Sequence, residues 1–288
     1  MGLLSTWLSS APKPLDIAKP HLELCGEALG GALQDLISGA EEQGGIELYV
    51  QAVKLKSALF KEVFSGNMAE LETEQLLQVC TFMPTVRRRI APYLDGKGLT
   101  KVRDALAGLL ADMKKVDACD ARIAAFCAQF PHDKEHRFIR DLAAEALHYL
   151  DPERYPMMMR WIWDAKSNTG VIREIWFGED VDHITIPVAD DLATFLMLRE
   201  ELAQFLSGQG FFRDVPEYID VLCAQIYANY ICAQGGTYLR TDFSAPEDPM
   251  QHTRRLLGLD GVRPGSSRTR LKAIDGSAYV IEDISLIS

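Results

Sequence analysis

Apolar residues recur at helical spacing along most of this 288-residue chain, and this repeat limits its fold more than any other feature. Glycine, proline and aspartate separate the repeats, and these residues commonly begin or end helices. We therefore predict a mainly α fold, a multi-helix globule with minor β structure. The spacing predicts helices at 20–40, 46–64, 70–82, 85–94, 100–114, 117–130, 133–149, 156–163, 190–206 and 216–232.

Two parts of the chain have the composition of short β-hairpins. Residues 171–177 and 183–188 are apolar and separated by acidic, turn-forming residues, so we expect them to pair as a central hairpin. Asp275-Gly276 lies between apolar residues of 271–284, which predicts a second hairpin near the C-terminus.

Pro131 is the strongest candidate for a domain boundary. We expect an N-terminal arm and linker at 1–19 and an N-terminal helical domain at 20–130. Residues 131–288 are expected to form a C-terminal α-rich domain with small β elements and a basic tail loop. The sequence leaves open whether the parts on either side of Pro131 are two domains or one bundle.

Composition excludes some classes of protein. A hydrophobic content of 48% excludes wholesale disorder, and a net charge of −11 opposes a surface that grips nucleic acid everywhere. The six cysteines contain no C-x-x-C pair, so we expect free thiols and a cytoplasmic protein. No apolar run approaches the roughly 20 residues that span a bilayer.

Four of the six histidines and three of the four tryptophans lie between His132 and His183. On the helix expected there, Asp141, Glu145 and His148 project from one side. Glu145 and His148 form an E-x-x-H pair, a unit of carboxylate-bridged metal sites. A second E-x-x-H, which a di-metal site needs, is absent.

A mononuclear metal site completed by His136 or His183 therefore remains one hypothesis. The acids beside His183 would raise the pKa of its imidazole and suit it to acid–base chemistry. The alternatives are a plain surface histidine, and a solvated helix face whose acids pair with Arg137 and Arg140. No G-x-S-x-G nucleophile motif accompanies these residues.

The residues from 251 to 272 reverse the overall charge of the chain. Forked guanidinium groups there could bind a nucleotide, RNA or an acidic protein surface, although the segment could equally pack on the acidic body of its own chain. The candidate residues for binding an anion or a partner are Arg254, Arg255, Arg268, Arg270 and, in the N-terminal arm, Trp7. The run from Arg87 to Arg89 is interpreted as solvated surface.

Residues 155–163 combine three methionines with two tryptophans. Such a composition suits either a buried helix or a protein-binding surface, and its apolar residues face several sides, which favours the core.

The leading functional hypothesis is a cytoplasmic accessory or regulatory protein that binds another macromolecule, most simply a protein. The alternatives are an enzyme, metal-dependent or acid–base, centred on the histidine-rich stretch, and a nucleotide- or nucleic-acid-binding protein that uses its basic C-terminal segment. The residues do not identify a catalytic group, a cofactor or an oligomeric state.

Overall fold

The computed structural model describes residues 22–178, 181–238 and 248–261, and almost all of its regular structure is helical. Its α-helices are α1 (Gly26–Glu41), α2 (Ile46–Phe64), α3 (Thr73–Thr81), α4 (Gly96–Leu110), α5 (Cys119–Cys127), α6 (Phe138–Leu150), α7 (Val171–Glu174), α8 (Leu192–Gly208), α9 (Val215–Tyr238) and α10 (Pro249–Leu256). Short 3-10 helices are η1 (Met68–Glu70), η2 (Ala91–Tyr93), η3 (Val116–Ala118), η4 (Val181–His183) and η5 (Leu259–Gly261). The prediction of a mainly α fold is confirmed.

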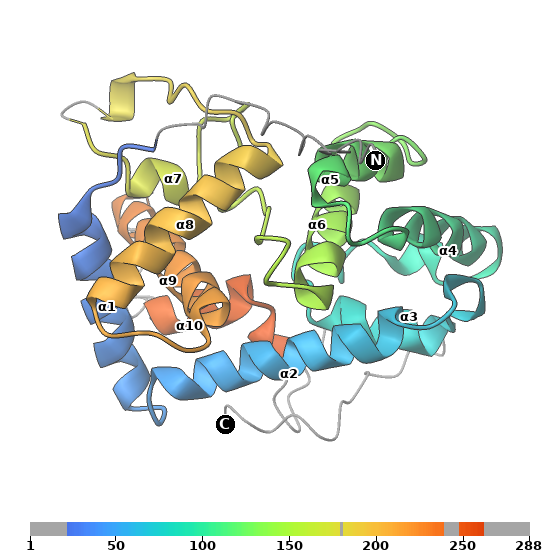
Figure 1. The fold of residues 1–288 in the computed structure, drawn as a ribbon, viewed down its shortest axis with the longest axis horizontal. Helices are drawn as coiled ribbons and strands as arrows, with labels where there is room; N and C mark the ends of the chain where they lie inside the picture. Colours follow the sequence, from blue (N-terminus) through green and yellow to red (C-terminus); the bar gives the residue numbers. More distant parts are fainter. Residues whose placement is uncertain (1–21, 179–180, 239–247, 262–288) are drawn as a thin grey trace, which may run out of the picture.

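Helix α2 lies along one side of the molecule and joins its two halves (Figure 1). Helix α6 packs on α2, while α1 packs against α9 and α10, and α8 crosses α9. One continuous hydrophobic core takes residues from both sides of Pro131. Helices from the two proposed domains are therefore in contact, and the division at Pro131 stays a prediction.

The central hairpin was predicted wrongly, because no β-strand occurs among the described residues. Val171 and Ile172 begin the single turn of α7 and are buried there. The side chain of Asn168 forms hydrogen bonds with the backbone of the second predicted strand. Its Nδ2 donates to Ile184 O, and its Oδ1 accepts from Ile186 N. These two bonds replace a pairing strand. The predicted C-terminal hairpin lies outside the described residues.

The segment 156–163 is buried, as its composition favoured, but it is not a helix. Side chains supply the donors that a helix would have given its carbonyls. Arg140 donates to Met158 O at 2.9 Å, and the His148 ring donates to Tyr155 O at 2.8 Å. Buried backbone carbonyls require such partners, so this irregular core segment depends on the polar side chains of α6.

One buried ammonium connects three segments. Lys56 Nζ on α2 donates to Glu145 Oε2 at 2.8 Å, Phe82 O at 2.7 Å and Leu257 O at 2.9 Å. Phe82 and Leu257 are the C-terminal caps of α3 and α10. The last carbonyls of a helix have no partner within the helix and carry a partial negative charge. The Lys56 ammonium offsets this charge at both helix ends and so fixes both helices against α2.

No helix among the described residues combines the length and the apolar composition required to cross a membrane. None of the six cysteines forms a disulfide. The sequence, which contains no C-x-x-C pair, led us to expect free thiols. Burial raises the pKa of the Cys119 thiol to about 12, so this sulfur stays protonated near neutral pH.

Candidate functional site

The three polar residues expected on one side of α6 are all buried, but each bonds to a different partner. The Asp141 carboxylate accepts two bonds from Arg160, whose Nε lies 3.1 Å from Oδ1 and whose NH2 lies 2.7 Å from Oδ2. Glu145 pairs with Lys56. Burial raises the pKa of Glu145 and lowers that of Lys56, while their mutual attraction opposes both shifts.

His148 is held between two acceptors in the core. Its Nε2 lies 2.7 Å from Asp220 Oδ2, and its Nδ1 lies 2.8 Å from Tyr155 O. Both partners accept, so both nitrogens donate, and the ring is an imidazolium paired with Asp220. Burial alone would lower the pKa of His148, but the charge and hydrogen bond of Asp220 raise it above its ordinary value.

The other two predicted metal ligands lie apart from these. His136 is partly exposed, and its Nδ1 lies 2.7 Å from Asp133 Oδ1. His183 is exposed in η4. The described residues contain no group of three histidine, cysteine, aspartate or glutamate side chains that could hold a metal ion. The five proposed ligands are thus not brought together.

A thiol lines the same small cavity as the His148–Asp220 pair. Cys223 is buried there on α9, in a space of about 20 Å³. Burial raises the pKa of its thiol far above the ordinary value, and both nitrogens of His148 already have acceptors. His148 therefore has no lone pair with which to deprotonate Cys223, and this arrangement lacks an activated nucleophile.

The residues predicted to bind an anion are placed differently from one another. Arg254 is buried and donates to Gln43 Oε1. Arg255, the next residue, is exposed at the end of α10. Trp7, Arg268 and Arg270 lie outside the described residues. Of the two predicted anion-binding arginines that the structure describes, Arg255 is therefore the exposed one.

Arg255 lines a pocket of about 440 Å³ in which six cations converge. We call it the basic pocket. Its lining residues include no acid and are Pro84, Thr85, Arg88, Arg89, Lys134, Arg137, Phe138, Met159, Arg160, Trp161, Arg255 and Leu256. They come from the turn after α3, the start of α6, the segment after α6, and α10. On a chain with a net charge of −11, this is a strong local excess of positive charge.

Two acidic side chains, one of them buried, hold the wall of the basic pocket in place. Asp141 fixes the guanidinium of Arg160 through two nitrogens and leaves NH1 without a bond to a described residue. Arg87, just outside the pocket, donates to both carboxylate oxygens of Asp260 at 2.9 and 2.7 Å. That ion pair fastens the chain after α10 to the turn that carries Arg88 and Arg89. The cations are thus supported by the core.

A further feature of the basic pocket favours an anion. The pocket lies at the N-terminus of α6, where Arg137 is the cap and Phe138 the first residue, and helix N-termini attract negative charge.

Sequence reasoning found Arg255 but missed the other members of the basic pocket. Arg88 and Arg89 were interpreted as solvated surface, which their exposure supports, but Arg87 is buried against Asp260. Arg137 was expected to pair with acids of its own helix, yet it forms no ion pair with a described acid. The sequence contains little signal for Lys134 and Arg137, because Asp133 and Glu135 lie beside them and cancel the local charge.

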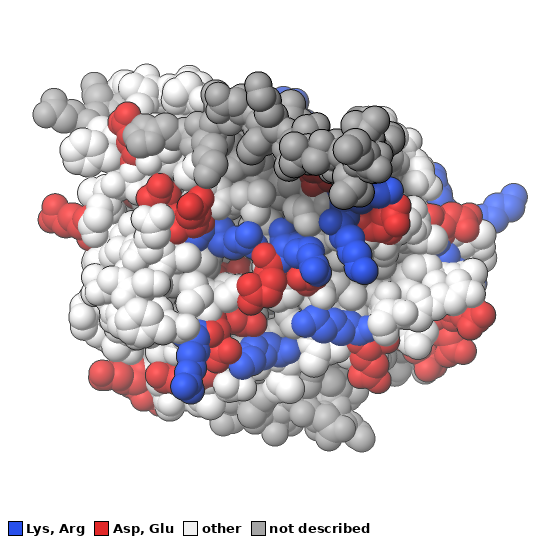
Figure 2. Space-filling model, in the orientation of Figure 1, with Lys and Arg blue, Asp and Glu red and all other residues white. Residues whose placement is uncertain are grey.

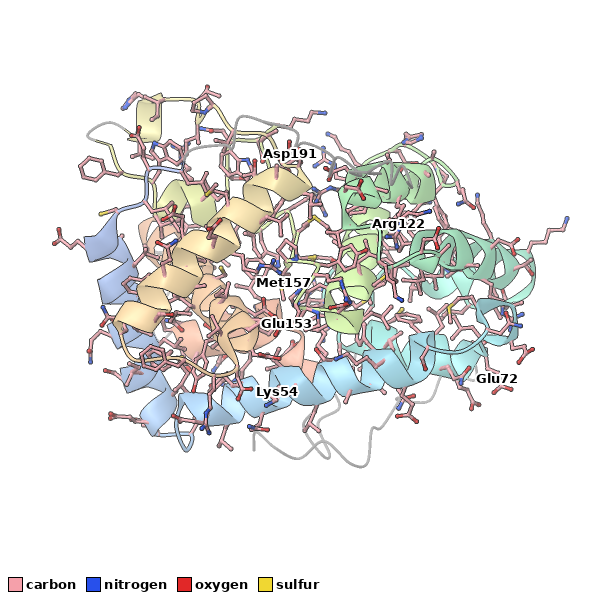
Figure 3. All side chains as sticks on the ribbon, viewed as in Figure 1. Lys54, Glu72, Arg122, Glu153, Met157 and Asp191 are labelled. Carbon is pink, nitrogen blue, oxygen red and sulfur yellow. The ribbon has the colours of Figure 1, made fainter. Side chains whose placement is uncertain are left out.

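A second hollow is a groove of about 600 Å³ between α8 and the start of α9. Glu153, which lines this groove, is labelled near the middle of the view in Figure 3. Its walls are mostly apolar, with residues such as Leu196, Met197 and Ile219, and both signs of charge occur among its polar residues, which are Glu153, Arg199 and Glu200. This mixture gives the groove no preference for a charged ligand, in contrast to the basic pocket.

Comparisons of this chain with protein-family models, with curated proteins and with solved structures found no match.

Proposed function

We propose that this protein is a cytoplasmic accessory or regulatory protein that binds a protein partner through the basic pocket. The observation that carries the proposal is the convergence of six cations, without a lining acid, on a chain that is otherwise acidic. Like charges held together destabilise a fold unless a ligand or counter-ion offsets them. A site that keeps such charges together is therefore suited to an anionic partner.

A protein partner suits this site better than a nucleic acid does. Within the part of the chain that the structure describes, the six converging cations line one pocket of about 440 Å³. On the face shown in Figure 2, acidic and basic side chains are interspersed, and the net charge of the chain is −11. A nucleic acid places a charge on every nucleotide and favours an extended basic track. An acidic group on a protein can enter one pocket without approaching the acidic remainder.

The cytoplasmic part of the proposal has its own support. No disulfide joins any of the six cysteines, and a cytoplasmic environment keeps thiols reduced. Cys80, Cys119 and Cys223 are also buried, where their raised pKa protects them from reaction.

The test is a comparison of captured partners between matched charge variants of the full chain. Arg137→Glu/Arg255→Glu reverses two exposed cations of the basic pocket. Lys61→Glu/Lys166→Glu changes the net charge equally at exposed sites away from it. We expect one partner to be retained by the wild type and the control but lost from the pocket variant, and its binding to weaken with salt. Equal recovery of every partner from both variants would overturn the proposal.

A further inference from the structure

We infer that the basic pocket recognises a phosphate monoester, the group carried by a phosphorylated side chain of the partner. This inference rests on the proposed function and specifies the ligand of that same pocket. It follows from the number of cations, the arrangement of their donors and the apolar floor of the pocket.

The charge of the pocket exceeds what one carboxylate can offset. Asp141 neutralises Arg160, and three other lining cations have no acidic partner among the described residues. Lys134, Arg137 and Arg255 form no ion pair with a described acid. A carboxylate brings one negative charge, whereas a phosphate monoester brings about −1.5 to −2 at neutral pH. Within one small pocket, the phosphate monoester is the better match.

The available donors also suit three phosphate oxygens. They approach from separate segments: Arg160 after α6, Arg137 at the cap of α6, and Arg255 on α10. Guanidinium forks bind phosphate oxygens in pairs, and Arg160 is already oriented by Asp141. A carboxylate offers two oxygens in one plane, so it would leave donors on the other sides unused.

The floor of the pocket favours a phosphorylated side chain over a phosphodiester. A diester phosphate continues into a sugar-phosphate chain on both sides. The basic pocket has a floor of buried, mostly apolar residues, among them Phe138, Met159 and Trp161. A phosphorylated side chain can enter with one end and rest its carbon atoms on this apolar floor.

The experiment measures binding of small probes to the full-length protein by titration calorimetry at about 150 mM salt. The probes are N-acetyl-O-phosphoserine amide, N-acetyl-aspartate amide and an oligothymidylate of about ten nucleotides. We expect the phosphoserine probe to bind one site, about tenfold or more tighter than the aspartate probe. Its affinity should rise between pH 5 and pH 7, because the second phosphate proton has a pKa of about 6.

Matched variants assign this binding to the basic pocket. Arg137→Ala and Lys134→Ala should each weaken the phosphoserine probe by about threefold to thirtyfold, since each removes one exposed charged donor. Lys166→Ala, exposed and away from the pocket, should leave the affinity unchanged. Arg160→Lys keeps the charge but loses the fork that Asp141 holds, so it should weaken binding more than Lys166→Ala.

Several outcomes would overturn the inference. Equal affinity for the aspartate and phosphoserine probes would mean that the pocket takes any anion. Tighter binding of the oligonucleotide would assign the site to nucleic acid. If no probe binds, but Arg137→Glu/Arg255→Glu still abolishes partner capture, the phosphate ligand is wrong and the proposed function stands. If the pocket variants change neither the binding of the probes nor the capture of the partner, both proposals fail.

Discussion

The guanidinium of Arg160 lies against the buried carboxylate of Asp141, with Nε and NH2 at 3.1 and 2.7 Å from its two oxygens. Asp141 belongs to the core face of α6, whereas Arg160 lines the basic pocket. This pair connects the interior to the candidate binding site. It explains how a cation can be held at the pocket without relying on ligand.

Replacing Arg160 by methionine is expected to destabilise the protein by about 3 kcal/mol. The change leaves Asp141, which is 1% exposed, as a buried carboxylate without its cation. The value lies at the lower end of the range for broken buried pairs because Arg160 is partly exposed. Urea unfolding measures the loss. Asp141→Leu added to Arg160→Met should recover part of it, and no recovery would show that the pair does not act as one unit.

Lys56→Met should be more damaging, by about 3 to 5 kcal/mol. It removes the ammonium from Glu145 and also leaves the carbonyls of Phe82 and Leu257 without their donor. Adding Glu145→Leu relieves the buried charge but not the carbonyls, so about 1 to 3 kcal/mol of destabilisation should remain. A double-mutant cycle in urea separates these parts. Complete recovery would mean that the carbonyls find other donors.

The sequence predicted helices best where apolar spacing was long and its ends were marked. The spacing over 46–64 coincides with α2, and Asp191 accepts from Thr194 N at the start of α8, close to the predicted start at 190. Over 85–94 the chain forms turns and η2 instead, with Pro92 inside the predicted helix. Helix α10 was not predicted, because it has only eight residues and three of its four buried residues, His252, Thr253 and Arg254, are polar.

The candidate site could be predicted only in part, because distant segments assemble it. Placing Asp141, Glu145 and His148 on one side of a helix was a sound inference from spacing. Their partners come from α2, α9 and the segment after α6, which no local pattern links to α6. Arg255 was found through local charge. The convergence of Arg88 and Lys134 on it depends on tertiary packing.

Gly258→Ala is expected to destabilise the protein by at least about 2 kcal/mol. Gly258 has a φ of +76°, and an added Cβ would lie 1.8 Å from Phe82 O, which also accepts from Lys56. Gly108→Ala is the matched control, because that helical position has open space and alanine favours helices by about 1 kcal/mol. Thermal unfolding should shift in opposite directions. A neutral Gly258→Ala would contradict the close packing of α10 on Phe82.

His148 should make stability depend on pH. Its folded-state pKa is raised above the ordinary 6.5, because Asp220 outweighs the opposing effect of burial. The stabilisation is therefore fully present below about pH 6.5 and is lost as the pH rises through the folded-state pKa, by at most about 1.4 kcal/mol per unit. Urea unfolding between pH 5.5 and about 8.5 measures this slope. His148→Gln should remove the slope, whereas His132→Gln, at an exposed histidine, should keep it. Identical slopes in the wild type and His148→Gln would show that His148 is not the imidazolium that its two acceptors require.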